Sequence, residues 1–315
     1  MVDIQLNNME VIVKKTFDLS DMEIEEINDI HYITLNFECS TEAFKNKFQN
    51  TALGYSYHSL LKENGKIVGS HAGIPFYYLK NGERFIAGLG IDSMILPLYR
   101  DFFHFKDIFK ACEKAMEADG CKLRIGFPND MSYPILKKGF HYKDVGLLNT
   151  YFLPVRASAF HNKLRLINPF FFILTFLWIC ISYFSKGKKT NSFIYERDRE
   201  SFNKTRFKWF NADYKKIEEK NFIFYYKIVN KQNVNTAFII DIYPLTRSNL
   251  EKAVRKIYLN EYKYIDMIIY VGKLHFRPFS LVKLPRFLEP KKFRFTCRVL
   301  DDNYFDNSVY DISNW

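Results

Sequence analysis

The chain has 315 residues, enough for about two domains at roughly 100–200 residues each. Hydrophobic residues make up 48% and charged residues 26%, which excludes a chain that is disordered throughout and allows a packed core. The formal net charge is +11. Such a charge attracts phosphates, nucleic acid or anionic lipid, or it serves only to keep the surface soluble, and it does not determine the fold.

Cysteine usage and the N-terminus bear on the compartment. The five cysteines are scattered, odd in number and include no Cys-x-x-Cys pair, which argues against a disulfide framework and against a zinc site. The N-terminal segment lacks the basic-then-apolar pattern of a signal peptide. We therefore expect reduced cysteines and a cytoplasmic protein.

The N-terminal part predicts helix followed by antiparallel strands. Residues 20–50 have isoleucines near helical spacing, with Ser20 as the expected N-cap. Strand-like segments then follow, at 55–61, 67–78 and 84–89. The turns between them are Asn64-Gly65 and Asn81-Gly82, and an Asn-Gly pair between two apolar runs indicates a tight hairpin because both central residues take positive φ. The sequence therefore predicts an antiparallel meander, which continues to Pro97.

After this meander, helices and strands alternate. A helix is predicted over 105–118, ended by Asp119-Gly120, and a strand over 121–127. A short helix over 132–138 and a last strand over 141–153 complete the pattern. This order of elements predicts an α/β domain over residues 1–155.

Residues 206–315 predict a second, smaller α/β domain. Strand-like segments alternate there with one helical segment, over 246–261. The predicted strands are 221–229, 236–243, 266–271 and 293–300. The two halves share no obvious sequence repeat, although their elements are of similar types.

A connector of different character, residues 156–205, joins the two domains. Residues 170–184 have the sequence FFFILTFLWICISYF, about 22 Å long as a helix. A membrane span needs about 20 residues, so a crossing is not predicted. Two interpretations stay open: a buried core or interdomain helix, and a helix lying in a membrane interface with its basic flanks on lipid headgroups.

The membrane interpretation of the connector is favoured by its charges. The segment is apolar all round, and residues 162–195 contain no acidic residue. The basic residues in that stretch are Lys163, Arg165, Lys186, Lys188 and Lys189. We therefore expect an anionic membrane surface as a partner, with the protein peripheral on the inner face of the cytoplasmic membrane.

Several motifs between residues 90 and 153 carry a resemblance to a known family. They are Ile-Asp-Ser-Met-Ile-Leu-Pro-Leu-Tyr-Arg at 91–100, Gly-Phe-Pro-Asn at 126–129, Ser-Tyr-Pro at 132–134 and Lys-Lys-Gly-Phe at 137–140. With the elements before them, they make residues 10–155 resemble the GNAT superfamily of acyl-CoA N-acyltransferases, and within it bacterial GNAT-like proteins associated with surface polysaccharide synthesis. The resemblance implies a mixed twisted sheet flanked by helices.

The second half resembles the same family more weakly. Its similarity rests on the Arg-Phe-Lys-Trp opening at 206–209 and the final Asn-Trp at 314–315. This resemblance implies a degenerate second GNAT-like domain over 206–315.

The resemblance implies acetyl-CoA or another acyl-CoA as cofactor. In the family, the strand before Pro-x-Tyr-Arg lends backbone groups to the acyl thioester and pantetheine, and these groups would lie on Ser93 and Ile95. The loop after Arg100 is normally glycine-rich and opens a helix whose N–H groups hold the pyrophosphate. Phe103 and Phe105 stand at the glycine positions, and a Cβ hinders the backbone approach that glycine permits. We therefore expect weak CoA binding.

Three more side chains lie near the expected cofactor. Asp101 places a negative charge beside the phosphate position. His104 either contacts phosphate or is simply solvated. Asn129 either binds cofactor or caps the following helix, and capping is favoured.

The catalytic candidates also come from the resemblance. The family frequently has a Tyr general acid four residues before the helix-ending Gly, and Ile135 stands there. Tyr133 is the nearby substitute, with poorly suited spacing. Asp92 on the central strand is the candidate general base, directly or through water. Its alternative role is that of an ordinary hydrogen-bonded strand residue.

Three functions fit these observations. An acyl-CoA-dependent N-acyltransferase would acylate a small-molecule or lipid-linked amine, such as an amino sugar of a surface glycan. A non-catalytic GNAT-fold scaffold in envelope glycan assembly fits the two phenylalanines and Ile135. An aminoacyl-transferring tandem-GNAT relative would use charged transfer RNA, which the positive charge suits. No RNA-reading motif is visible, so neither RNA nor DNA is an expected partner.

Overall fold

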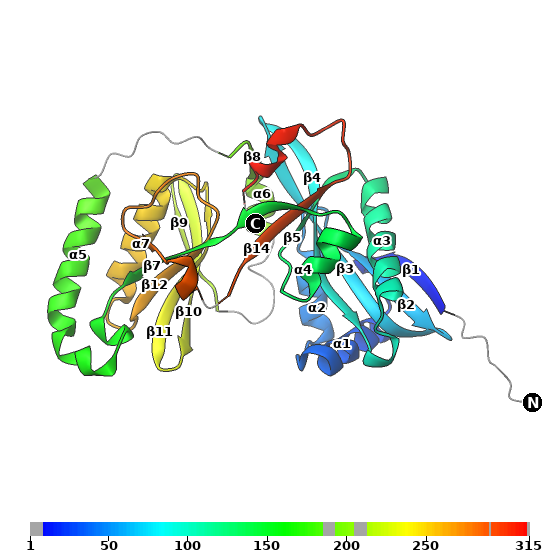
Figure 1. Ribbon diagram of the computed structural model, residues 1–315, viewed down its shortest axis with the longest axis horizontal. Helices are drawn as coiled ribbons and strands as arrows, with labels where there is room; N and C mark the ends of the chain where they lie inside the picture. The colour runs from blue at the N-terminus through cyan, green and yellow to red at the C-terminus, as the bar shows by residue number, and fades with distance from the viewer. Residues whose placement is uncertain (1–8, 185–192, 205–212, 290, 314–315) are drawn as a thin grey trace, which may run out of the picture. The chain divides into compact units, whose positions relative to one another are not determined.

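The computed structural model describes residues 9–184, 193–204, 213–289 and 291–313. The described residues form two compact units, and each unit takes segments from both halves of the chain (Figure 1). Unit 1 contains the described residues within Met1–Gly146, Ile194–Ala212 and Arg294–Ile312. Unit 2 contains those within Leu147–Phe193, Asp213–Phe293 and Ser313–Trp315.

Unit 1 is a twisted mixed sheet flanked by helices. Its strands are β1 (Met9–Lys15), β2 (Tyr57–Glu63), β3 (Lys66–Lys80), β4 (Glu83–Ile95), β5 (Cys121–Gly126), β6 (Lys143–Leu147), β8 (Tyr195–Arg197) and β14 (Arg294–Val299). They lie in the order β1-β2-β3-β4-β5-β14-β6, with β8 paired to β3. The pairs from β1 to β4 are antiparallel, and β4 and β5 are parallel.

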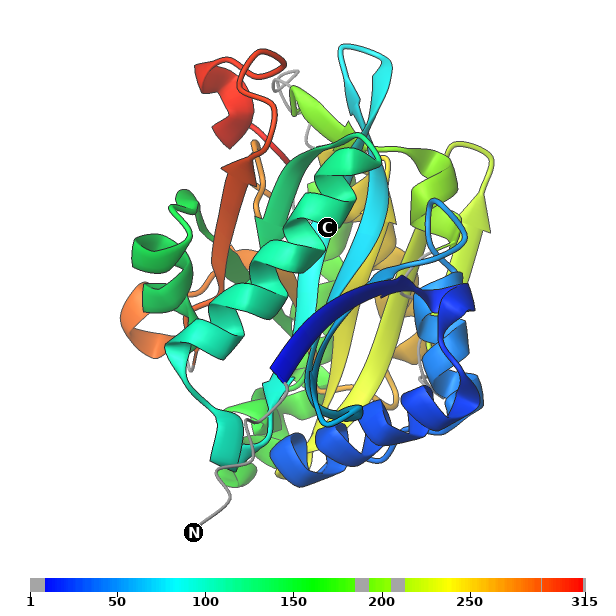
Figure 2. The ribbon, with the colours of Figure 1, turned by 90° about the vertical axis from the view of Figure 1, so that its right-hand side faces the viewer.

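The helices of unit 1 pack on this sheet. They are α1 (Asp21–Leu35), α2 (Thr41–Gln49), α3 (Phe102–Ala118), α4 (Ser132–Pro134), which continues into a π-helical turn at Ile135–Gly139, and α6 (Arg199–Lys204). Helix α3 connects the parallel strands β4 and β5 and lies across β1 to β5 (Figure 2). The predicted helical segment over 20–50 is two helices, because Asn36 takes a left-handed conformation that ends α1 and Ser40 caps α2.

Both predicted Asn-Gly turns are confirmed. Asn64 and Gly65 have φ of 50° and 82°, and Asn81 and Gly82 have φ of 50° and 88°. Turns with two positive φ angles match the right-handed twist of the flanking strands. They fix β2, β3 and β4 as the antiparallel meander on which the candidate site is built.

Unit 2 also contains a mixed sheet. Its strands are β7 (Asn149–Pro154), β9 (Lys215–Glu219), β10 (Phe222–Lys231), β11 (Val234–Tyr243), β12 (Met267–Gly272) and β13 (Val282–Lys283), in the order β13-β7-β12-β11-β10-β9. Strands β11 and β12 are parallel and are connected by α7 (Arg247–Glu261). The other pairs are antiparallel.

Helix α7 supplies much of the unit 2 core. Leu250, Ala253, Val254 and Ile257 are fully buried, at the spacing of one helix face. Helix α5 (Asn168–Phe184) packs against α7. The Tyr258 hydroxyl of α7 donates to the backbone carbonyl of α5 residue 172, at 2.9 Å, so α5 is fixed to its own unit.

The strands are not distributed as the sequence predicts. The predicted strand over 141–153 is two strands, β6 in the unit 1 sheet and β7 in the unit 2 sheet. The predicted strand over 293–300 is β14, which pairs with β5 in unit 1. The units therefore do not follow the predicted boundaries at 155 and 206, because pairing across the whole chain decides which sheet a strand joins. The motifs at 206–209 and 314–315 lie outside the described residues.

Candidate active site

Strands β4 and β5 separate in the middle of the unit 1 sheet. They pair from Ile86 with Cys121 to Leu89 with Ile125, which is their last pair in the described part of the chain. Beyond that pair β4 continues to Ile95, while β5 pairs on its other side with β14. We call the ends of β4 and β5 beyond this last pair the strand fork.

A β-bulge lies on β4 within the strand fork. Ala72 pairs with Ile91 and Ser70 pairs with Met94, so two residues of β4 lie opposite His71 alone. One of these two residues, Asp92, has φ of 48°. Bulges of this kind leave a residue out of the ladder and change the direction of side chains. Here the bulge presents Asp92 and its neighbour to different partners.

The neighbour, Ser93, begins a chain of polar contacts that leads into the core. Its hydroxyl oxygen lies 2.7 Å from Nδ1 of His71. The other ring nitrogen of His71, Nε2, lies 3.2 Å from Nη2 of Arg124 on β5. Ser93 is exposed, whereas His71 and Arg124 are buried. This series of polar contacts therefore extends from solvent to the protein interior.

The proton positions in this series of contacts follow from which groups can donate and which can accept a hydrogen bond. A guanidinium only donates, so Nε2 of His71 accepts from Arg124. Burial lowers the pKa of His71 well below its usual value, and the charge of Arg124 lowers it further. His71 is therefore neutral, and its proton is on Nδ1, which donates to Ser93. The hydroxyl hydrogen of Ser93 is left free to donate outward.

Arg124 is an unusual core residue, because its side chain is fully buried. Its Nη1 lies 3.1 Å from the sulfur of Met116, and its guanidinium carbon lies 5.2 Å from the centre of the Phe109 ring. A Cβ on Gly90 would lie 2.8 Å from Nη2 of Arg124, so glycine makes room for the guanidinium. This places a positive charge beside β4, under the strand fork.

Side chains from two helices contact Asp92. Lys47 of α2 donates to its Oδ2, and Nε2 of His31 on α1 lies 3.4 Å from the same oxygen. Burial alone would raise the pKa of Asp92, but the hydrogen bond from His31 and the charge of Lys47 outweigh burial and lower it. A carboxylate held in its ionised form is a weak proton acceptor. These contacts favour the alternative role of Asp92, as a hydrogen-bonded strand residue, over the predicted general base.

The first turn of α3 is capped from within the chain. An oxygen of Asp101 accepts the backbone N–H of His104 at 2.8 Å, and the other lies 2.8 Å from Nδ1 of the same histidine. Phe103 is 71% exposed, whereas Phe105 is half-buried against the rings of Phe109 and Phe140. A carboxylate therefore occupies the N-terminal end of α3, where an anion is most favourable.

Comparison with known proteins points to one fold. No protein-family model and no curated protein matches the sequence. Among solved structures, a GCN5-related N-acetyltransferase from Kribbella flavida is similar at 8% identity and a TM-score of 0.56, over 94% of this chain and 72% of that chain. Another, from Anabaena variabilis, is similar at 13% identity and a TM-score of 0.57, over 91% and 73%. A probable N-acyltransferase of Enterococcus faecalis has 13% identity, a TM-score of 0.54, and coverage of 93% and 73%.

The chain has the GNAT fold. The similarity extends over almost the whole chain, so it includes residues of both units. At these identities it establishes the fold of GCN5-related N-acetyltransferases and leaves substrates to the chemistry of the site.

The acyl-CoA that the GNAT fold implies can be tested against the first turn of α3. A pyrophosphate held there needs free backbone N–H groups and a neutral or positive surrounding. Asp101 instead supplies a carboxylate that already accepts the N–H group of His104. A pyrophosphate bound there would lie beside this carboxylate, and the two negative charges would repel each other. The guanidinium of Arg100 is also engaged, since it donates to the carbonyl oxygen of Ile95. These residues do not fit a pyrophosphate.

The two predicted residues near α4 have structural partners. Asn129 accepts the N–H groups of Met131 and Ser132 at 3.1 and 2.9 Å, which is the capping role favoured from the sequence. The hydroxyl of Tyr133 donates to Asp144 at 3.0 Å, and its ring lies under the Arg294 guanidinium. These contacts place Tyr133 beside Asp144 and Arg294 rather than beside Asp92.

Sequence reasoning missed His71, Arg124 and Lys47. His71 and Arg124 meet Ser93 across different strands, so no local motif connects them. One signal was present: Arg124 stands in a strand that is otherwise apolar at its inward positions, and a charge in such a strand needs a partner. Lys47 lies in a helix with ordinary polar spacing, which gave no signal.

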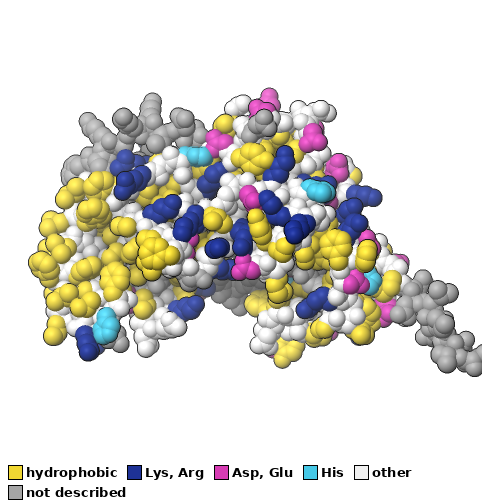
Figure 3. Space-filling model, in the orientation of Figure 1, with side chains coloured by type: hydrophobic (Ala, Val, Ile, Leu, Met, Phe, Trp, Pro, Cys, Tyr) yellow, Lys and Arg dark blue, Asp and Glu magenta, His cyan; other side chains and the backbone are white. Residues whose placement is uncertain are grey.

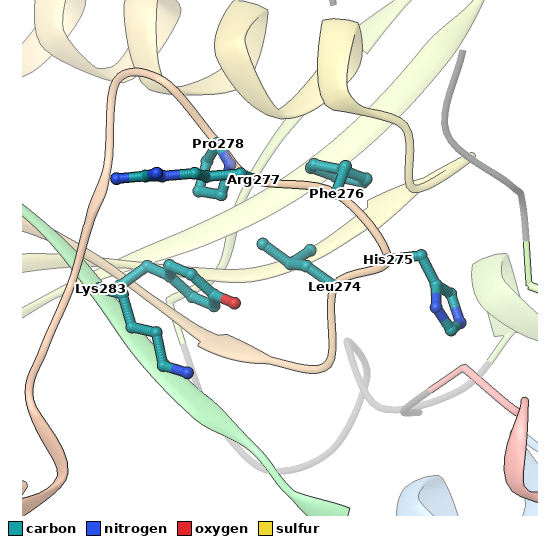
Figure 4. Close-up of a pocket in the computed structure, with 7 residues that line it drawn as sticks. Leu274, His275, Phe276, Arg277, Pro278 and Lys283 are labelled. Atoms are coloured by element: carbon teal, nitrogen blue, oxygen red, sulfur yellow. The ribbon is translucent and has the colours of Figure 1, made fainter. Parts of the chain in front are cut away.

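Unit 2 contains a pocket of its own, of about 650 Å³. Residues of the loop after β12 line one side of it, and Lys283 lines another (Figure 4). The lining residues are Tyr151, Leu274, His275, Phe276, Arg277, Pro278 and Lys283. The lining mixes basic and apolar side chains, and none of the residues predicted for the site contributes to it.

Proposed function

We propose that this chain is an N-acyltransferase of the GNAT type, with the strand fork as its acyl-transfer site. The observation that carries the proposal is the hydroxyl of Ser93, which His71 orients so that its hydrogen is free to donate outward. Such an oriented donor stabilises negative charge that develops on an acyl carbonyl oxygen. The buried charge of Arg124 acts in the same direction, because the surrounding core screens it little.

The donor and acceptor are part of this proposal. Acyl-CoA is the donor that the GNAT fold suggests, and its diphosphate would have to lie away from the capped N-terminus of α3. We propose an amine as acceptor, either a small molecule or a lipid-linked amino sugar of a surface glycan, and a cytoplasmic location. We also propose that unit 2 is a degenerate GNAT-like domain, because β11-α7-β12 has the same parallel crossover as β4-α3-β5.

The second candidate function is a non-catalytic GNAT-fold scaffold in envelope glycan assembly. Asp101 favours it, because a carboxylate stands where a diphosphate is expected. The two candidates differ in one property: only the first requires an acyl donor to bind unit 1 and to react there.

The decisive experiment measures acyl transfer from acetyl-CoA and longer acyl-CoAs to a panel of amines, including amino sugars. Thiol release gives the rate, and mass spectrometry identifies the product. We expect Ser93→Ala to lower kcat about a hundredfold to a thousandfold, since one oriented hydrogen-bond donor is removed. Ser248→Ala, an exposed serine in the first turn of α7, is the matched control and should leave the rate unchanged.

The outcomes separate the candidates. Transfer that depends on Ser93 supports the acyltransferase and the proposed site. Transfer that Ser93→Ala leaves intact would move the site elsewhere in the fold. If no thioester reacts and calorimetry detects no CoA binding, the acyltransferase proposal fails and the scaffold remains.

A further inference from the structure

Helix α5 has its polarity inverted relative to a helix of a water-soluble protein. Its outward face consists of large apolar side chains that are each at least 42% exposed. They are Phe170, Ile173, Leu174, Phe176, Leu177, Trp178 and Ile181. Isolated exposed apolar residues are common on protein surfaces, but a continuous exposed patch of this size marks an interaction site.

Two hydroxyl side chains of α5, those of Thr175 and Ser182, lie on its inward face. Thr175 is 5% exposed, and its hydroxyl donates to the backbone carbonyl of Pro154 at 3.2 Å. Ser182 is 2% exposed, and its hydroxyl donates to the backbone carbonyl of Ile179 at 2.7 Å. A helix that covers its hydroxyl groups and exposes its hydrocarbon is suited to an apolar environment outside the protein.

The apolar surface continues into the turn before α5. Within the 3-10 helix Asn162–Ile167, Leu166 is 91% exposed and Ile167 is 48% exposed. Hydrophobic side chains accordingly dominate the surface over α5 and this turn (Figure 3). Leu259 of α7 and Tyr264, which follows α7, are also exposed.

The charged residues that flank α5 in the sequence are all basic. Lys163 and Arg165 are exposed in the turn that precedes α5, and Lys186, Lys188 and Lys189 follow α5 in the sequence. No acidic residue occurs from residue 162 to residue 195. We propose that α5 lies in the interface of an anionic membrane and docks the protein there. Its apolar face would enter the acyl region, and its basic flanks would contact phosphate headgroups.

The connections of α5 decide between lying in the membrane and crossing it. By length and composition alone, the segment Lys163–Ser182 could cross, with a mean hydropathy of 2.0. It is longer than the predicted apolar run because the helical turn before α5 extends it. However, β7 just before α5 pairs with β12 far beyond it, from Asn149 with Gly272 to Pro154 with Met267. Crossing would place paired strands on opposite sides of the bilayer, so α5 lies in the plane of the membrane.

The side chains of this face fit lipid better than a protein partner. Protein interfaces carry about one hydrogen bond per 100–200 Å² of buried area. On the outward face of α5, Trp178 alone among the described residues has a side-chain hydrogen-bonding group. Tryptophan is the residue enriched at membrane–water interfaces, where its ring is buried and its N–H stays hydrated. Charge and composition therefore agree on an anionic lipid surface.

Vesicle flotation of the full chain tests the docking. Vesicles of phosphatidylcholine with about one third phosphatidylglycerol should carry the chain upward at low salt, and phosphatidylcholine alone should carry much less. Ile173→Glu with Leu177→Glu should lower the partition coefficient at least about tenfold, because charges enter the apolar face. The control, Phe287→Glu with Leu288→Glu, changes two exposed apolar residues of unit 2 that lie off α5 and should float like the unchanged chain.

The basic flank is tested by a second variant, Lys163→Glu with Arg165→Glu. It should weaken flotation with anionic vesicles and leave the weak flotation with neutral vesicles unchanged. The charge-matched control is Lys220→Glu with Lys231→Glu, which changes two exposed residues of unit 2, one in the turn after β9 and one at the end of β10. Raising salt from about 0.1 M to about 1 M should reproduce the flank variant, since the screening length falls from about 10 Å to about 3 Å.

The depth of α5 is measured with Trp178. In a chain with Trp209→Phe and Trp315→Phe, Trp178 is the remaining tryptophan. Vesicles should shift its fluorescence to the blue, and lipids brominated near the headgroup should quench it more than lipids brominated near the chain end. Strongest quenching at the chain end would overturn the in-plane geometry.

Two results would overturn the docking itself. One is a chain that stays below anionic vesicles at low salt. The other is a chain whose α5 face is covered by a second copy: sedimentation would show a dimer that Ile173→Glu with Leu177→Glu converts to a monomer, without flotation in either form. Neither result depends on whether the strand fork catalyses acyl transfer.

Discussion

Asp101 places a carboxylate at the end of α3 where the GNAT fold leads one to expect a phosphate. It caps the helix by accepting the N–H of His104, which stabilises the helix in the way that Asp commonly does. The same group opposes a second anion at that position. Asp101 therefore stabilises α3 and at the same time disfavours the binding of an anion at its N-terminus.

Substitutions at the N-terminus of α3 test this effect on anion binding. Asp101→Ser keeps a good N-cap and removes the charge, and Phe103→Gly removes an exposed ring without disturbing the core. We expect the double variant to bind CoA about two- to fivefold more tightly in calorimetry, because a charge at a helix end is worth about 0.3–1 kcal/mol. Asp107→Asn, which changes an exposed carboxylate further along α3, is the control.

Phe105 is left in place in this test because its role is structural. The sequence places it at a glycine position of the cofactor loop, but its ring packs on Phe109 and Phe140. If CoA affinity does not rise in the double variant, the end of α3 does not serve phosphate, and the scaffold candidate gains support.

At the scale of elements, Glu23 connects α1 to two strands. It completes the capping box with Ser20, and its carboxylate accepts from Lys14 of β1 at 2.9 Å and from Lys62 of β2 at 3.0 Å. Burial alone would raise the pKa of Glu23, but the hydrogen bonds from Lys14, Ser20 and Lys62 lower it to about 2. Its unpaired value is 4.5.

This shift predicts an acid-dependent loss of stability. Because the folded-state pKa is lower than the unfolded one, the contribution of Glu23 is complete above about pH 4.5 and is lost as the pH falls toward about 2. It amounts to about 1–3 kcal/mol, with Lys14 partly solvated. Urea unfolding at stepped pH should show that Glu23→Gln lowers stability at neutral pH and flattens the decline between these values. Glu25→Gln, exposed on the same helix, should leave both unchanged; a Glu23 variant with the unchanged decline would contradict the assignment.

The elements that could be predicted have local causes. Ser20 with Glu23, and each Asn-Gly pair, determine their own backbone within a few residues, so the sequence alone indicates α1 and the meander. In contrast, Ser93 meets His71 from 22 positions away, and His71 meets Arg124 from 53 positions away. The proton arrangement of the site therefore depends on sheet register, which no local signal contains.

At the scale of the whole molecule, the halves of the chain exchange strands. The first half ends in β7, which pairs with β12 in unit 2. The second half supplies β14, which pairs with β5 in unit 1, and Phe295 and Cys297 of β14 are buried there. The compositions of β7 and β14 are typical of buried strands. The sequence pattern therefore predicted each of them to lie in the domain formed by its own half of the chain. Only pairing partners distant in sequence reveal the exchange.

The exchange predicts how the chain behaves when it is cut. We consider a specific protease site placed within residues 185–192, followed by complete cleavage. If domains were contiguous, with boundaries at 155 and 206, the pieces would separate without denaturant. In the observed topology they share two sheets, through β5 with β14 and β7 with β12. We therefore expect the pieces to co-elute in gel filtration and to separate only in urea. A cut between residue 8 and Met9, where β1 begins, is the control for the effects of protease treatment and handling. Replacing Phe295 and Cys297 by Asp would place charges against the core of unit 1 and weaken the pairing of β14 with β5, so the cut pieces of that variant should have fewer stabilising contacts between them and should separate at lower urea. Pieces of the unchanged chain that elute apart in buffer would contradict the exchanged topology.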